Sequence, residues 1–83
     1  MYKIVYYYKE TIGNTVNEEV VEGDEFRLRR NALHYVLDIV QSDYREDDWG
    51  TEPIVGGINC YKSEKTENGN RKIMEVRIKV EKA

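Results

Sequence analysis

The sequence has few of the residues that mark a disulfide framework, a linker or a membrane span. It contains one cysteine, one proline and six glycines among 83 residues. A single cysteine excludes an internal disulfide, and so few prolines and glycines argue against a flexible tail. No stretch approaches the roughly 20 apolar residues of a spanning helix. The first ten residues alternate Tyr, Val and Ile with Lys, unlike a signal peptide, so we expect a cytoplasmic protein without membrane contact.

The balance of charge is slightly acidic. Lysine and arginine number 13 and aspartate and glutamate 16, which gives a formal charge of −3. A chain of this size buries only about 60% of the surface that it exposes when unfolded. We therefore predict a single domain over residues 1–83, with one core and no deep active-site cleft.

Two segments near the N-terminus alternate with the period of β-strands. They are Tyr2–Lys9 and Thr15–Glu22. The sequence Ile12-Gly13-Asn14 lies between them and contains the two residue types that most readily adopt positive φ, so a hairpin is predicted. One face of the first strand carries the larger apolar side chains, Tyr2, Ile4, Tyr6 and Tyr8.

The spacing of apolar residues becomes helical between Asp24 and Tyr44. The apolar positions recur every three or four residues, at Ala32, Leu33, Val36, Leu37, Ile39, Val40 and Tyr44. Either Asp24 or Asn31 is a suitable N-cap. Gly50, followed by Pro53, predicts that the helix has ended by Gly50.

The last third of the chain returns to the period of two. Ile54–Tyr61 is predicted as a strand in which Gly56-Gly57 marks a bulge or a close backbone approach. Lys72–Val80 is predicted as its partner, joined through a type I′ turn at Asn68-Gly69. The expected fold is α+β, with the order ββαββ and one helix packed on a four-stranded, mainly antiparallel sheet.

This arrangement predicts the core. We expect Leu37 at the centre of the helix face, where its truncation to alanine would destabilise the domain by roughly 2 to 5 kcal/mol. The helix residues expected in the core are Leu33, Val36, Leu37 and Val40. Their expected partners on the sheet are Ile4, Tyr6, Met74, Val76, Ile78 and Val80.

No residue pattern predicts catalysis or a cofactor. His34 and Asp38 have the spacing of an oriented imidazole, but no nucleophile accompanies them, and Cys60 is predicted within a strand. One histidine and one cysteine cannot form the usual zinc set, and the acidic residues lack the order of a calcium loop. We therefore expect neither an enzyme nor a metal site.

Arginines crowd the start of the predicted helix. We call Arg27, Arg29 and Arg30 the arginine cluster; it lies at the end where the helix dipole disfavours cations. Either nearby acidic residues neutralise the cluster or it is a contact surface. With outward tyrosines, it would supply the phosphate contacts and stacking platforms of a nucleic-acid-binding module.

Carboxylates and aromatics alternate after the helix, the composition of a protein-binding hot spot. We call these residues the exit segment, consisting of Tyr44, Asp47, Asp48, Trp49 and Glu52, with Asp43 and Glu46 as acidic neighbours. Its carboxylates are also able to replace phosphates in front of a basic groove. The alternative, and the commoner fate of a tryptophan, is that Trp49 folds back and closes the helix end against the core.

These features favour a small acidic protein-binding module, an inhibitor or adaptor of a nucleic-acid-handling enzyme. In size, charge and lack of catalytic residues the chain resembles phage and mobile-element proteins that block a host enzyme, among them anti-CRISPR and anti-restriction proteins. The resemblance is one of type, and no residue carries over from it. The alternatives are a nucleic-acid-binding module that uses the arginine cluster, or a structural domain that forms a homodimer.

Overall fold

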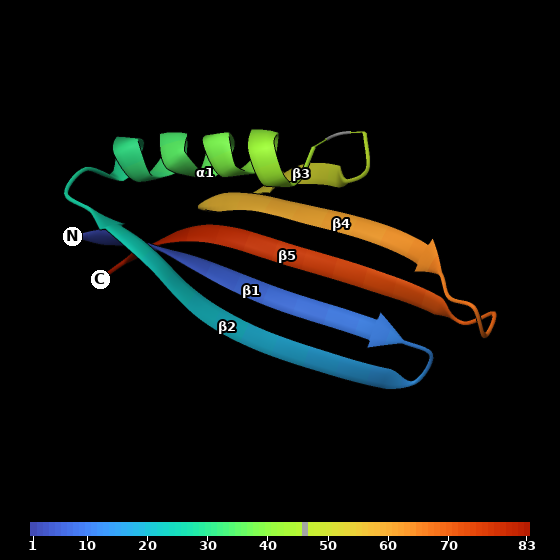
Figure 1. Ribbon diagram of the computed structural model, residues 1–83. Helices are drawn as coiled ribbons and strands as arrows, with labels where there is room; N and C mark the ends of the chain where they lie inside the picture. The colour runs from blue at the N-terminus through green and yellow to red at the C-terminus, as the bar shows by residue number, and fades with distance from the viewer. Residues whose placement is uncertain (46) are drawn as a thin grey trace.

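The computed structural model describes residues 1–45 and 47–83, which form one helix and one antiparallel sheet (Figure 1). The elements in chain order are β1 (Tyr2–Ile12), β2 (Thr15–Phe26), α1 (Arg29–Asp43), β3 (Gly50–Ile54), β4 (Gly57–Lys65) and β5 (Arg71–Lys82). Among these residues no helix has both the length and the apolar character to cross a membrane. The expected combination of one helix with one antiparallel sheet is confirmed, but the sheet has five strands and not four.

The strand order is β2-β1-β5-β4-β3, and every neighbouring pair is antiparallel. Consecutive strands form three hairpins, so most pairings are local. The exception is the centre of the sheet, where β1 pairs with β5 along its whole length, from Tyr2 opposite Lys82 to Ile12 opposite Lys72. At the end of this pairing the Ala83 N–H donates to the carbonyl of Met1 (3.0 Å), which places the two ends of the chain side by side (Figure 1).

The segment Ile54–Tyr61, predicted as one strand, is divided between β3 and β4 by a tight turn. Ile54 pairs with Gly57, so only Val55 and Gly56 connect the strands. Gly56 has φ of +78°, which an L side chain rarely adopts, and its carbonyl accepts the Val80 N–H (2.8 Å). A Cβ on Gly57 would lie 1.9 Å from the carbonyl oxygen of Ile78. The predicted close approach is therefore confirmed at Gly57, whereas the predicted bulge is a turn.

The helix begins at Arg29, between the two starts that the sequence allowed, because β2 continues to Phe26. Neither predicted cap is used: Asp24 lies in β2, Asn31 lies inside α1, and Leu28 occupies the cap position without a side-chain hydrogen bond. The register of β1 and β2 shifts between Lys3 and Val5, where one β1 residue faces two of β2. This bulge bends β2 and carries it toward the start of α1.

The other two hairpins form at the predicted places. Gly13 has φ of +56° and begins a two-residue turn between Ile12 and Thr15. The second turn is wider than the type I′ turn that we predicted, because Gly69 and not Asn68 has positive φ (+81°). Its backbone hydrogen bonds run from Gly69 to Thr66 (3.0 Å) and from Thr66 to Asn70 (2.7 Å), as in a three-residue loop with a glycine bulge.

The core lies between α1 and the inner face of the sheet. Its buried members are Ile4, Ala32, Val36, Val40, Cys60, Val76, Ile78 and Val80. Within the helix the buried residues lie four apart, at Ala32, Val36 and Val40, and form one seam. Leu37 lies one residue beyond this seam and is 48% exposed, so its prediction as a central core residue is wrong. Leu33 packs at the edge of the core, and Met74 lies outside it, in the groove described below.

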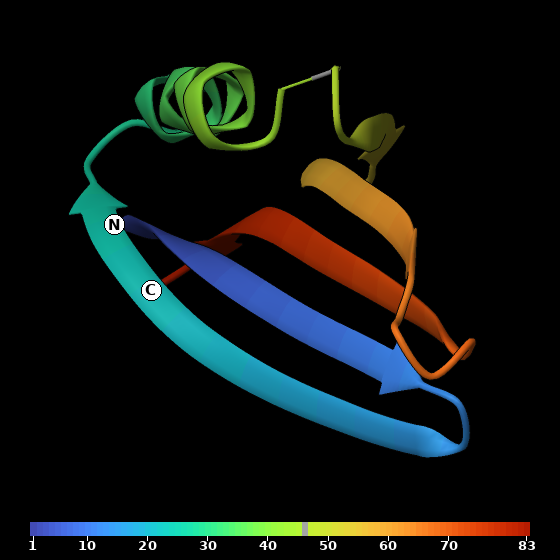
Figure 2. The same ribbon diagram turned by 45° about the vertical axis from the view of Figure 1, so that its right-hand side comes forward.

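The helix covers only part of the inner face. Figure 2 shows the sheet curving beneath α1, with the ends of the β1–β2 and β4–β5 hairpins extending past the helix. A strand rises about 3.3 Å per residue and a helix only about 1.5 Å. Strands of nine to twelve residues are therefore longer than the 15-residue helix that covers them. The far part of the concave face is therefore covered by no helix or strand of the described residues.

Candidate functional site: an acidic groove beside Trp49

A groove of about 460 Å³ lies where the helix ends and the uncovered sheet begins. The inner-face side chains Tyr8, Met74 and Val76 form its floor. Tyr44 and Trp49 form the wall on the helix side. Residues of the β1–β2 hairpin and Glu75 of β5 complete the lining, and the hairpin residues on the inner face are Glu10, Asn17 and Glu19.

The aromatic wall is built by the turn that follows α1. The helix ends at Asp43, and the carbonyl of Arg45 then accepts the N–H groups of Asp48 (3.1 Å) and Trp49 (2.9 Å), which reverses the chain. The reversal places the Trp49 ring edge-to-face against Tyr44, with centroids 4.9 Å apart and planes at 84°. Such aromatic pairs are worth about 0.5 to 1.5 kcal/mol beyond the area that they bury.

The groove environment keeps the Tyr44 hydroxyl protonated. Burial raises the pKa of Tyr44 far above its ordinary value of 10.0, and its interaction with the hydroxyl of Tyr8 adds to the rise. The two phenols meet on the helix side of the groove floor. Tyr44 is therefore a hydrogen-bonding group and not a charged one throughout the physiological range.

Carboxylates outnumber cations around the groove. Glu10, Glu18, Glu19 and Glu75 all line it, and Lys9 is the one cation among the lining residues that the structure describes. Glu10 lies 3.7 Å from the Lys72 ammonium, and Glu19 forms no ion pair within the described part of the chain. The Lys62 ammonium lies 5.6 Å from the centre of the Trp49 ring, and Lys62 pairs with Met74 across the β4–β5 ladder. The groove therefore combines an apolar floor with a negative rim.

The structure divides the exit segment instead of gathering it into one surface. Tyr44 and Trp49 meet at the groove, and Asp47 and Asp48 are exposed in the turn above it. Glu52 points to the outer face of β3, where it accepts a hydrogen bond from the Asn59 amide (3.1 Å). Of its acidic neighbours, Asp43 is exposed at the helix end, and Glu46 lies outside the described residues.

Trp49 folds back on the core and also lines the groove. It packs against the core and closes the helix end, as a buried tryptophan would, and the rest of its ring lines the groove. Sequence reasoning missed Glu10, Glu19 and Met74 as groove residues. The alternation of the strands placed Tyr8 on the correct face, but no local pattern indicates where a covering helix will end.

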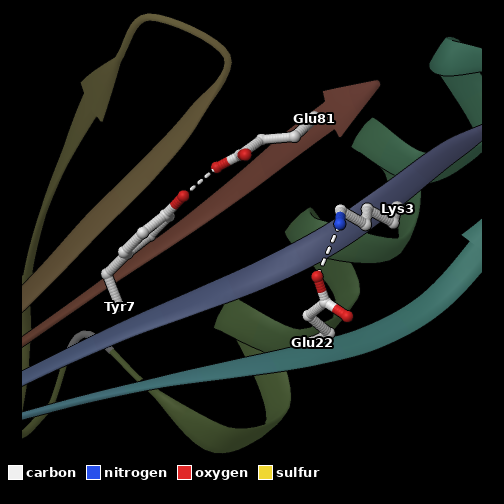
Figure 3. Close-up of polar contacts among 4 residues, drawn as sticks. All are labelled: Lys3, Tyr7, Glu22 and Glu81. Atoms are coloured by element: carbon white, nitrogen blue, oxygen red, sulfur yellow. Dashed lines mark hydrogen bonds and ion pairs between the residues drawn. The ribbon is translucent and has the colours of Figure 1, made fainter. Parts of the chain in front are cut away.

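The arginine cluster is exposed at the start of α1. None of its three guanidinium groups forms an ion pair within residues 1–45 and 47–83. Glu22, Asp24 and Glu25 are the nearby acidic residues expected to neutralise the cluster. Two of them interact elsewhere: Glu22 pairs with Lys3 (2.5 Å; Figure 3), and a hydrogen bond with Asp24 raises the pKa of Tyr35. Tyr2, Tyr6, Tyr8 and Tyr44 pack against the core, which removes four of the seven tyrosines as outward stacking platforms.

The candidate catalytic residues His34, Asp38 and Cys60 lie on two different elements, the first two on α1 and the third in β4. His34 and Asp38 are exposed on α1. Burial raises the pKa of the Cys60 thiol to about 11, so the thiolate that would act as a nucleophile is scarce at neutral pH. Within the described residues, no three side chains of His, Cys, Asp or Glu gather as metal ligands would.

Comparison with known proteins gives no relative: no protein-family model, curated protein or solved structure matches this chain.

Proposed function

We propose that this protein is a non-catalytic protein-binding module, an inhibitor or adaptor whose partner inserts basic side chains into the acidic groove. The observation that carries the proposal is the groove itself, with an aromatic wall and a carboxylate rim on a part of the sheet that no described helix or strand covers. A solvated acidic surface would have the carboxylates without the apolar floor. A simple extension of the core would have the apolar floor without the carboxylates.

The groove suits the chemistry of arginine and lysine. Their long apolar stems pack on hydrophobic surface while their charged heads stay at the rim. The stem would lie on Tyr8 and Met74, and the head would reach Glu10 or Glu19. An aromatic ring also attracts a cation over its face, and Lys62 already takes this position on Trp49.

A partner that handles nucleic acid fits this chemistry. Such enzymes hold phosphates in grooves lined with lysine and arginine. Carboxylates at the rim of this groove, together with Asp47 and Asp48 above it, would compete for those cations. The proposal therefore keeps the expectation of a cytoplasmic inhibitor of the kind that phages and mobile elements encode, directed at an enzyme with a basic groove.

The test uses baits that differ in the charge of the groove. Wild-type protein and Glu10→Gln/Glu19→Gln would each capture partners from native cell extract, followed by mass spectrometry and surface plasmon resonance on the captured protein. The matched control is Glu25→Gln/Glu67→Gln, which removes the same charge from exposed positions outside the groove. Circular dichroism would verify that each bait is folded.

The proposal expects a partner that wild type and the control capture equally. Loss of Glu10 and Glu19 should slow its association and flatten the salt dependence of that rate, because rim charges act mainly on encounter. Trp49→Ala, in a folded sample, should mainly speed dissociation. Equal kinetics for all four proteins would refute the groove as the binding site.

A further inference from the structure

We infer that β2 is a docking edge, on which a basic extended segment of a partner protein adds a sixth strand to the sheet. The inference deepens the proposed function, since it names how a basic partner is held. It depends on a separate feature, the free edge of the sheet, and it can be tested apart from the groove.

The backbone of β2 is open along one side. All of its twelve residues except Phe26 are exposed, and β2 pairs with β1 alone (Figure 1). Ile12 and Thr15 flank the two-residue turn and form a hydrogen-bonded pair, so the backbone groups of Thr15 point toward β1. From Thr15 onward, the backbone groups of successive residues point alternately toward β1 and away from it. Counting from Thr15, the backbone N–H and C=O groups of Glu18, Val20 and Glu22 point away from β1.

The opposite edge of the sheet is protected. β3 has only five residues, and Pro53 occupies a position whose backbone faces away from β4, so the edge lacks a donor there. A short strand with a proline is a poor template for a further strand. β2 is more than twice as long and contains no proline, so charge is its main protection.

That charge has one sign. Glu18, Glu19, Glu22, Asp24 and Glu25 are the charged residues of β2, and the strand contains no lysine or arginine. Within the described residues only Glu22 has an ion-pair partner, Lys3 of β1 (Figure 3). The other four carboxylates form no ion pair among the described residues, although Lys9 lies opposite Glu18 and Lys3 opposite Glu25 across the β1–β2 ladder.

This charge selects the occupant. A second copy aligned antiparallel about Val20 would place Glu18 of each chain opposite Glu22 of the other, and like charges directly opposite destabilise a strand pair. A segment with lysines opposite Glu18, Glu19 and Glu22 would form opposite-charge pairs instead. Apolar residues between them would meet Val20 and Val21, which are 61% and 39% exposed. The edge thus repels its own copy and fits a basic β-strand.

The experiment uses a peptide of that pattern, Thr-Lys-Val-Val-Lys-Lys-Thr with blocked ends, added to ¹⁵N-labelled protein. Amide hydrogen exchange at Glu18, Val20 and Glu22 should be fast in the free protein and slow by about tenfold or more in the complex. A peptide of the same sequence with N-methylated backbone amides has the same charge but cannot form the ladder. Val20→Pro removes an N–H that β1 does not use, and should weaken binding about fivefold to tenfold.

Protection of these three amides by the lysine peptide, absent with the N-methylated peptide, would support the docking edge. Equal binding of the two peptides would overturn it, and so would a dimer of the free protein that already protects the edge. The N-methylated control keeps the test decisive if Val20→Pro fails to fold. Exchange at β2 reports on this inference alone. Glu19 belongs to both sites, but Glu10 lies in β1 and lines only the groove, so a failure of the groove would appear as unchanged capture by the single variant Glu10→Gln.

Discussion

Two adjacent helix residues, Val36 and Leu37, allow a direct test of how α1 packs. Val36 is 1% exposed in the seam of the helix, and Leu37 is 48% exposed beside it. Truncation of Val36 to alanine removes apolar groups worth about 0.8 kcal/mol for each buried methylene, and the cavity left behind adds a cost of similar size. We therefore expect Val36→Ala to lower the free energy of unfolding by about 2 to 3 kcal/mol.

Leu37→Ala removes more atoms, but half of the side chain is already in water and no closed cavity forms. We expect a cost below about 1 kcal/mol. A domain of this size has a total stability of roughly 4 to 12 kcal/mol, so both changes are measurable in a protein that still folds. Val36→Ala should lower Tm by roughly 10 to 20 °C.

Urea unfolding followed by circular dichroism would measure both variants, with the slope m compared between them. Equal slopes permit the midpoints to be read as stabilities. A larger loss for Leu37→Ala than for Val36→Ala would refute the packing described here and restore the helix orientation that the sequence alone suggested.

Three further predictions concern titration, backbone packing and the arginine cluster. Because the folded state raises the pKa of Tyr44 above 10.0, the stability that it contributes is complete below pH 10 and falls as the pH rises above it; urea midpoints should therefore drop at alkaline pH, and less so in Tyr44→Phe. Gly57→Ala places a methyl group on the Ile78 carbonyl and should cost about 1 to 3 kcal/mol or more by thermal unfolding, whereas a cost near zero would contradict the β4–β5 register. The arginine cluster should give no salt-sensitive complex with a generic oligonucleotide at physiological ionic strength, and a submicromolar complex lost on charge reversal would favour the nucleic-acid-binding alternative.

The sequence predicted the elements whose signals are local. The alternation from Tyr2 and the glycine at position 13 were enough for the first hairpin. The Val55-Gly56 turn was missed because a two-residue turn preserves the period of two on both of its sides. The start of α1 stayed open between Asp24 and Asn31 because the end of β2 at Phe26 depends on pairing with β1 and not on the sequence of β2 alone.

The candidate site was predicted in part, for a related reason. Tyr44 and Trp49 were found because their aromatic side chains are unusual among carboxylates. Glu10 and Glu19 were not found, because nothing in the sequence around them differs from that of other exposed strand residues. Only the folded sheet places them in the same groove as Trp49. The groove exists because the hairpins are longer than the helix that covers them, and that mismatch is a property of the assembled layers.

The pairing of β1 with β5 sets the order in which this chain can fold. The two central strands are separated by nearly the whole described sequence. Bringing them together closes a loop of that length, and the chain entropy is lost before the hydrogen bonds between β1 and β5 compensate for it. A nascent chain that has emerged only as far as Asn70 has the hairpins on either side but not the strand that joins them. Both of its half-sheets would expose unpaired edges, so the interval before β5 emerges is when this protein is most open to aggregation or to binding by a chaperone. A circular permutant that links Ala83 to Met1 and opens the chain at Gly13 would convert the slowest contact into a hairpin.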